Sequence, residues 1–176
     1  MADDQDTVHS YTVIVKAMTS KEESVMHAMS ILLATDGSRE ALSAAEWVDR
    51  WADPRMVEIT VAIVVTPPSL SWTLGAGGYI LDADIYQKTY REIIEDAQTA
   101  ARKALKETRA HMSHGAVIKE EILVGYPAKA LVEYAKAHHV DLVVMGRRGH
   151  SALSNLVGSV SFGVLQRSPI PVTIVS

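Results

Sequence analysis

The chain has 176 residues, of which 48% are hydrophobic and 22% charged, and its formal net charge at pH 7 is −4. This length and composition fit one domain with a full hydrophobic core and exclude a disordered chain. The acidic balance argues against a nucleic-acid binder, which needs basic residues to neutralise phosphates. The absence of cysteine excludes disulfides, thiolate metal sites and cysteine nucleophiles.

The beginning of the chain lacks the pattern of a secretion signal. Residues 1–6 are acidic, whereas such a signal starts with basic residues followed by an apolar stretch. The longest apolar runs have the length of strands, so we expect no membrane span. We therefore expect a cytoplasmic protein that has no membrane partner.

Two kinds of segment alternate from residue 30 onward. Short β-branched runs predict buried parallel strands at Ile31–Thr35, Val57–Val65, Val117–Val124, Asp141–Met145 and Ile170–Val175. Segments with helical periodicity lie between them, at about 38–52, 84–113, 127–139 and 159–168. This alternation predicts an α/β domain with a parallel sheet and right-handed crossovers.

Two of the predicted helices have a clear apolar face. Ser38 is the expected N-cap of the first, whose buried side comprises Ala41, Ala45, Val48 and Ala52. The second is long, and its predicted buried stripe comprises Tyr90, Ile93, Ala97, Ala101, Ala104, Leu105 and Thr108.

Two regions fall outside the alternation. Thr66–Leu81 is rich in proline, glycine and aromatic residues and predicts a long loop, of the kind that often forms a lid or contact surface. Residues 1–29 contain a strand-like run, Tyr11–Val15, and a helix-compatible stretch, 21–28. We divide the chain into an N-terminal extension, 1–29, and a domain, 30–176.

A glycine-rich segment, 146–161, carries the clearest chemical signal. Gly146 and Gly149 follow a predicted strand, and Gly158 opens a helix that begins with serines. Glycines let the backbone approach a phosphate, and helix N-terminal amides attract anions. The segment predicts an anion site, most plausibly for a nucleotide; tight turns alone would explain the glycines about equally well.

Several motifs in order resemble the universal stress protein family. They are Asp36-Gly-Ser after the first strand, Gly125-x-Pro-Ala before a helix, the segment from Asp141 to Ser161, and a closing strand that follows Pro169. The resemblance covers about residues 30–176. It implies a three-layer, Rossmann-like fold of the adenine nucleotide alpha-hydrolase-like type, with an open, twisted, five-stranded parallel sheet in the order 3-2-1-4-5. Asp36 and Gly146 would then lie together where the strand order reverses.

The resemblance also implies ATP as ligand, with Mg or Mn carried by its phosphates. Ala34, Thr35 and Asp36 would line the nucleoside, the Val65 main chain would meet the adenine edge, and Met145 would pack near the sugar or base. The phosphates would be held by amides around Gly146, Arg148, Gly149, Gly158, Ser159 and Val160, and by the hydroxyls of Ser159 and Ser161. Eight residues separate Gly149 from Gly158, one fewer than in the ATP-binding motif of the family.

By this resemblance the chain is expected to be an ATP-binding stress-response protein that acts as a nucleotide-responsive homodimer, paired through Ile170–Val175. We expect no enzyme, or at most weak ATPase activity, because the sequence lacks a lysine-bearing phosphate loop and a nucleophile elbow. We expect no metal site made of protein side chains. The alternatives are a scaffold of the same fold that does not bind nucleotide, and a slow ATP hydrolase.

Overall fold

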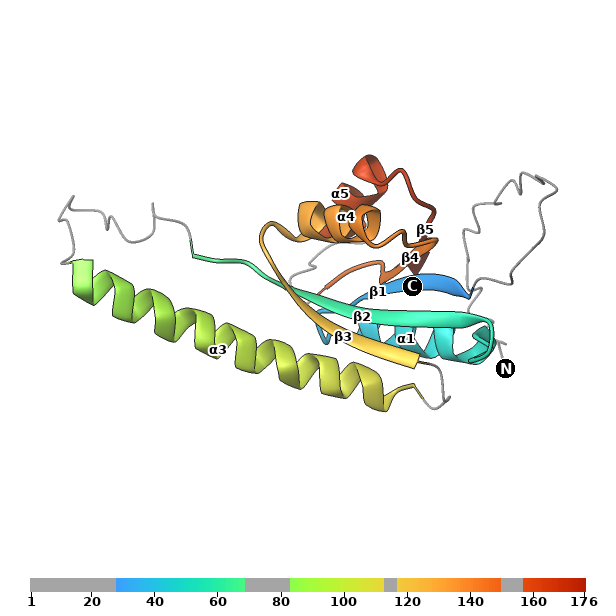
Figure 1. Cartoon of the computed structure of the whole chain (residues 1–176), viewed down its shortest axis with the longest axis horizontal. Helices are drawn as coiled ribbons and strands as arrows, with labels where there is room; N and C mark the ends of the chain where they lie inside the picture. The colour runs from blue at the N-terminus through green and yellow to red at the C-terminus, as the bar shows by residue number, and fades with distance from the viewer. Residues whose placement is uncertain (1–27, 69–82, 113–116, 150–156) are drawn as a thin grey trace, which may run out of the picture.

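A twisted parallel sheet organises the chain in the computed structural model, which describes residues 28–68, 83–112, 117–149 and 157–176 (Figure 1). Its strands are β1 (Met29–Ala34), β2 (Val57–Val65), β3 (Val117–Val124), β4 (Leu142–Gly146) and β5 (Val172–Val175). All neighbours pair in parallel, in the order β3-β2-β1-β4-β5. The predicted fold class and strand order are therefore confirmed.

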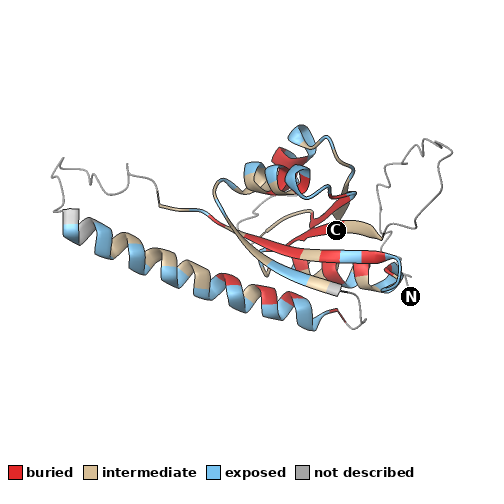
Figure 2. Ribbon diagram, viewed as in Figure 1, coloured by how far each residue is buried: buried red, intermediate tan, exposed pale blue. Residues whose placement is uncertain are grey.

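Helices cover both faces of this sheet. One face packs against α1 (Arg39–Trp51) and α3 (Ala83–Ala110), and the other against α4 (Pro127–Ala137) and α5 (Ser159–Arg167). Successive side chains of a strand point to opposite faces, so Ile31 and Leu33 join the first core and Leu32 joins the second. The central strands are consequently buried on both sides (Figure 2), and this explains why their sequences are continuously apolar.

The last strand is shorter than predicted. It begins at Val172, because the chain first makes a turn in which Ser168 Oγ donates to the Ile170 carbonyl oxygen (2.7 Å) and accepts from the Ile170 N–H (3.1 Å). Pro171 has no N–H to donate, although its carbonyl oxygen still accepts from Val143 N–H at 2.9 Å. Ile170 and Pro171 therefore lie before the strand and not in it.

Helix α1 follows the prediction closely. Ser38 is its N-cap, and the Ser38 side chain accepts a hydrogen bond from the Ala41 N–H. The predicted face, which includes Ala45, Val48 and Ala52, is buried. The helix ends at Trp51, before Pro54.

The predicted buried stripe of α3 is correct only toward the C-terminal end of the helix. Ala101, Leu105 and Thr108 are buried, whereas Tyr90 and Ile93 are only half-buried. Figures 1 and 2 show the reason: the N-terminal half of α3 runs past the ends of the strands, so less of the domain covers it. Helical periodicity marks which side of a helix is apolar and does not tell how far along the helix the core extends.

Some predictions concern residues outside the described part of the chain. They include the strand-like run Tyr11–Val15 and residues 69–81 of the predicted loop. The division at residue 30 stays a prediction. Among the residues that the structure describes, no helix is long and apolar enough to cross a membrane.

Candidate functional site

The strand order reverses between β1 and β4, and we call the region at the carboxyl ends of these two strands the crevice. Ala34 at the end of β1 pairs with Met145 of β4. The chain leaves β1 for α1 on one face of the sheet, whereas α5, the helix that follows β4, lies on the other. In open parallel sheets the carboxyl ends of strands at such a point leave room for a ligand.

The turn after β1 brings Asp36 against the segment that follows β4. Asp36 is exposed, and its Oδ1 accepts a hydrogen bond from Ser38 N–H at 2.9 Å. Its other carboxylate oxygen lies so near Gly149 that a methyl group there would overlap it. Ser38 adds a second link, because its Oγ donates to the Arg148 carbonyl oxygen at 3.4 Å. The predicted proximity of Asp36 to the glycine segment is therefore present.

A chain of hydroxyl groups fixes this turn to α3. Thr108 Oγ1 donates to the Ala104 carbonyl oxygen (2.8 Å), so the hydrogen bond between the Thr108 and Thr35 hydroxyls (2.8 Å) uses the Thr35 proton. Thr35 Oγ1 in turn accepts from Gly37 N–H at 3.1 Å. Thr35 is 7% exposed and Thr108 0%. Each buried hydroxyl thus donates once and accepts once, as buried polar groups require.

The glycines of the segment allow close backbone packing. A Cβ on Gly146 would lie 2.7 Å from the main chain of Glu40, in the first turn of α1. A Cβ on Gly158 would lie 3.2 Å from the Arg147 carbonyl oxygen, which accepts a hydrogen bond from Gly158 N–H at 2.9 Å. The two ends of the shortened loop therefore meet directly; residues 150–156 lie outside the described part of the chain.

The N-terminus of α5 opens beside this junction. Its N-cap is Gly158, a residue with no side chain that could accept from the first amides of the helix. Ser159 is exposed. Ser161 is 3% exposed, and its hydroxyl donates to the Gly146 carbonyl oxygen at 2.9 Å. The Ser161 proton that we expected to face a phosphate is thus used within the protein, whereas the Ser159 hydroxyl lies at the surface.

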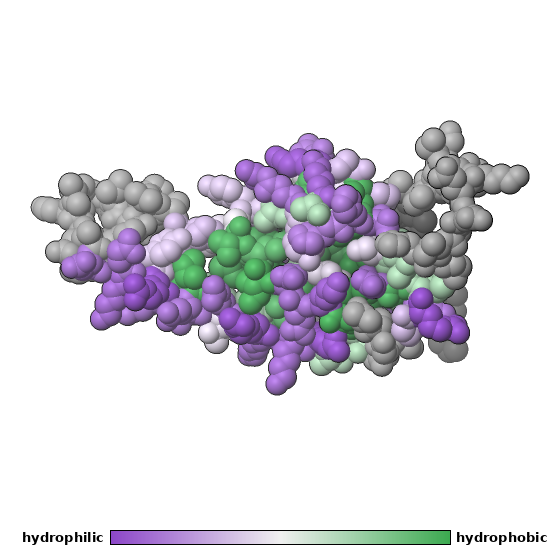
Figure 3. Space-filling model, in the orientation of Figure 1, coloured by the Kyte–Doolittle hydropathy of each residue, from purple (hydrophilic) through white to green (hydrophobic). Residues whose placement is uncertain are grey.

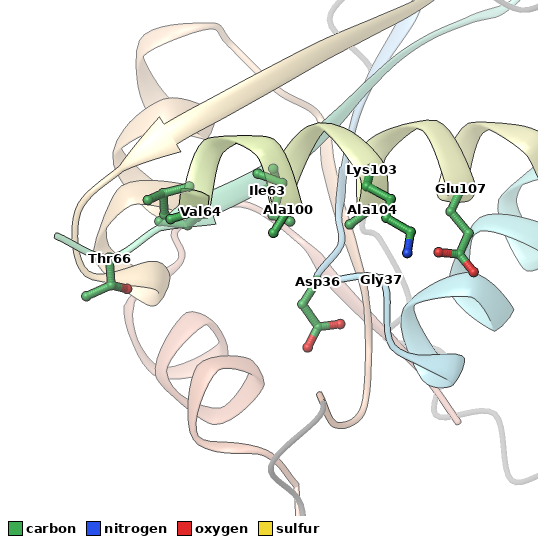
Figure 4. A pocket seen from close by; sticks show the side chains of 12 residues that line it. Asp36, Gly37, Ile63, Val64, Thr66, Ala100, Lys103, Ala104 and Glu107 are labelled. Carbon is green, nitrogen blue, oxygen red and sulfur yellow. The ribbon is translucent and has the colours of Figure 1, made fainter. Parts of the chain in front are cut away.

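On the other side of Asp36, a cleft of about 500 Å³ separates the turn and the end of β2 from α3 (Figure 4). Figure 3 shows an apolar area around the C-terminal ends of β2 and β3 on the visible face of the molecule. The lining residues are Asp36, Gly37, Ile63, Val64, Val65, Thr66, Ala97, Ala100, Ala101, Lys103, Ala104 and Glu107. The Val65 carbonyl oxygen accepts from Gly125 N–H at 3.0 Å, so a ligand that used this oxygen would share it.

Comparison with known proteins gives the family. The model of the universal stress protein family matches residues 28–176. The chain belongs to this family.

Relatives and solved structures agree with the family match. A universal stress protein of Mycolicibacterium smegmatis is 33% identical over 147 residues, which are 82% of this chain and 47% of the relative. The chain thus spans about half the length of that relative. Universal stress protein MJ0531 of Methanocaldococcus jannaschii is 30% identical over 146 residues, 82% of this chain and 80% of the relative.

Two solved structures have the same fold. The structure of MJ0577, also from Methanocaldococcus jannaschii, has a TM-score of 0.63 at 24% identity and covers 84% of this chain and 94% of its own. A universal stress protein crystallised in complex with cAMP has a TM-score of 0.53 at 29% identity and covers 84% of this chain and 96% of its own.

In this universal stress protein, the predicted site residues fall into two groups by exposure. Those that are exposed or half-buried are Asp36, Arg148, Gly149, Gly158, Ser159 and Val160. Those that are buried are Ala34, Thr35, Val65, Met145, Gly146 and Ser161. The second group shapes the crevice through the backbone and the core packing.

The wall that α3 contributes was not foreseen as part of a site. The sequence predicts Ala97, Ala101 and Ala104 for the buried stripe of the helix, and Lys103 lies outside that stripe. Their spacing is the same whether the helix faces a core or a cleft. What distinguishes a core-facing from a cleft-facing helix is the position of α3 relative to the end of β2, and this position is set by the tertiary structure.

Proposed function

We propose that this universal stress protein binds an adenine nucleotide, with ATP as the expected ligand, in the crevice between the Asp36 turn, the glycine segment and α5. The observation that carries the proposal is the uncapped N-terminus of α5 at Gly158. The first amides of a helix have no partner within it, and the helix dipole favours an anion there. The exposed Ser159 hydroxyl adds a donor beside these amides.

The two sides of Asp36 suit the two parts of a nucleotide. The amides of α5 favour phosphate, and the neighbouring cleft of about 500 Å³ lies within the usual size of small-molecule pockets. The carboxylate of Asp36 accepts hydrogen bonds, as a ribose hydroxyl requires of a partner. The family relative bound to cAMP supports the same class of ligand, since cAMP also contains adenine, ribose and phosphate.

The proposal includes the surroundings of this nucleotide. Mg or Mn would come with the phosphates and would need no ligand from the protein. The protein would act in the cytoplasm as a homodimer paired along β5, which is an edge of the sheet; an apolar edge strand favours pairing with another chain. Sedimentation velocity with and without ATP tests the dimer, and a monomer at every concentration would contradict it.

Calorimetry on the full chain tests the binding. Wild type is expected to bind ATP, and Gly158→Val to abolish binding, because a side chain there would press on the main chain of Arg147 and Arg148 and disturb the backbone beside the α5 amides. Gly158 has φ −63° and ψ 154°, which any residue can adopt, but its Cβ would lie 3.2 Å from the Arg147 carbonyl oxygen, so circular dichroism is needed to show that the variant folds. Ala137→Val, at the exposed far end of α4, is the matched control.

Two results would overturn the proposal or change its class. If wild type binds neither ATP, AMP nor cAMP at millimolar concentration, the protein is a scaffold without nucleotide. If ATP is hydrolysed with Mg or Mn and Gly158→Val removes that activity, the protein is a slow hydrolase. Hydrolysis that survives the substitution would identify a contaminant.

A further inference from the structure

Helix α3 closes the cleft beside Asp36 with small side chains. Ala97, Ala100, Ala101 and Ala104 all line it. In Figure 4, Ala100 and Ala104 face the end of β2 and the turn at Gly37. Together these small side chains form an apolar wall of the cleft.

The core explains some of these alanines, and not all. Ala101 is 3% exposed and belongs to the core cluster. Ala104 packs on Gly37, where a Cβ would come within 2.9 Å of the Ala104 methyl. Ala100, by contrast, is exposed and still lines the cleft. Packing of the domain therefore gives no reason for a small residue at position 100.

The same wall carries charge. Among the described residues that line the cleft, Lys103 is the single basic one, and Asp36 and Glu107 are the acidic ones. Figure 4 shows the Lys103 side chain extending from α3 toward the turn at Asp36 and Gly37. The cleft thus combines a flat apolar surface with one cation and two carboxylates, which matches a ligand that has a planar ring, hydroxyl groups and an anionic group.

We propose that α3 is the third wall of the nucleotide site, where Ala100 contacts the base and Lys103 contacts the anionic part of the ligand. Position 100 then sets the width of the base pocket, and position 103 raises the affinity for charged nucleotides over neutral nucleosides. This inference rests on the proposed nucleotide binding and adds contacts that lie outside the glycine segment.

The steric half of the inference is tested with one substitution at two places on α3. Ala100→Leu keeps a good helix former at an exposed position, yet its side chain would occupy the cleft. We expect it to raise the Kd for ATP at least tenfold, or about 1.4 kcal/mol. Ala110→Leu, also exposed but outside the cleft, is expected to leave the Kd unchanged.

The proposed role of the Lys103 charge is tested with Lys103→Ala. This substitution removes no core contact, and it provides a second variant if Ala100→Leu folds poorly. We expect a severalfold weaker affinity for ATP at low salt, a loss that shrinks as salt is added, and an unchanged affinity for adenosine. Lys106→Ala, an exposed lysine outside the cleft, is the control. Circular dichroism checks that every variant is folded.

The outcomes separate this inference from the function on which it rests. If wild type binds ATP and Gly158→Val abolishes binding, but Ala100→Leu and Lys103→Ala bind as wild type does, α3 is no part of the site and the inference is wrong. If Ala110→Leu or Lys106→Ala weakens binding equally, the effect belongs to the helix in general and the inference is also wrong. If wild type binds no adenine nucleotide, the proposed function fails and the inference fails with it.

Discussion

The hydroxyl chain between the Asp36 turn and α3 makes a directional prediction about stability. Thr108→Val keeps the shape of the side chain and removes the acceptor of the Thr35 proton, which leaves a donor unsatisfied at a residue that is 7% exposed. A buried unsatisfied donor costs about 1–3 kcal/mol. We therefore expect Thr108→Val to lower the free energy of unfolding by about that amount.

Thr99 offers a matched control on the same helix. Its hydroxyl also donates to a carbonyl oxygen four residues earlier, that of Glu95, at 2.9 Å, but Thr99 is exposed. Thr99→Val removes the same kind of bond without orphaning a partner, so we expect a change within about 0.5 kcal/mol. The difference between the two variants measures the cost of the orphaned Thr35 proton.

A double-mutant cycle tests the direction of the chain. Thr35→Val alone leaves Thr108 donating to Ala104 and orphans no hydroxyl proton. It removes the bond that the Thr108 oxygen accepts and the acceptor of the half-exposed Gly37 N–H, which water can reach. In the double variant no hydroxyl is orphaned. We therefore expect its loss of unfolding free energy to be about 1 kcal/mol smaller than the sum of the losses in the two single variants.

Equilibrium urea unfolding, followed by circular dichroism, measures all four variants. With a slope of about 2 kcal/mol/M, the expected loss for Thr108→Val moves the midpoint by roughly 0.5–1.5 M. Equal effects of Thr108→Val and Thr99→Val, or strict additivity in the cycle, would show that the Thr35 proton has another acceptor, and the chain would then be wrong.

Two further predictions concern the ends of α1. Gly37 has φ +77°, so Gly37→Ala is expected to cost about 1–2 kcal/mol of stability from the backbone and more from the close approach to Ala104. Differential scanning fluorimetry should show a melting temperature lower by several degrees. An unchanged melting temperature would refute the backbone strain predicted for alanine at this position. At the other end, side-chain and backbone hydrogen bonds from Arg55 hold the pKa of Asp53 at about 2, below its ordinary 3.8. A lowered carboxyl pKa stabilises the fold above pH 4, and the effect disappears as the pH falls toward 2. The melting temperatures of wild type and Asp53→Asn should therefore converge over that range. A difference that stays constant would contradict the lowered pKa of Asp53.

The fold was predictable because its signals are local and agree with one another. Continuous apolar runs such as 61–65 identify strands that are buried on both faces. Ser38 marks a helix start through a hydrogen bond that spans three residues. The order of the strands is a different kind of property. No residue pattern within β1 or β4 specifies that they are neighbours, and that prediction came from the family resemblance.

The candidate site was predictable in position and less so in detail. Asp36 was expected beside Gly146; its carboxylate lies against Gly149 of the same segment, and Gly146 packs on the main chain of Glu40 instead. Sequence gives the kind of side chain at Ser161 and leaves open where its hydroxyl points, which depends on the nearby Gly146 carbonyl oxygen. The sequence does not identify Ala100 as a site residue for a similar reason, because an alanine on a helix has the same helical spacing beside a core and beside a cleft.

The uneven burial of α3 has a consequence for its motion. Its C-terminal half is held by the core near Leu105 and by the hydroxyl chain at Thr108, whereas residues 84–95 are half-buried or exposed wherever their burial is described. A helix anchored at one end opens from the other, and its amide protons exchange with solvent in that order. Exchange should therefore be fast at the outer turns and slow near Thr108, with Ala100 on the boundary between them.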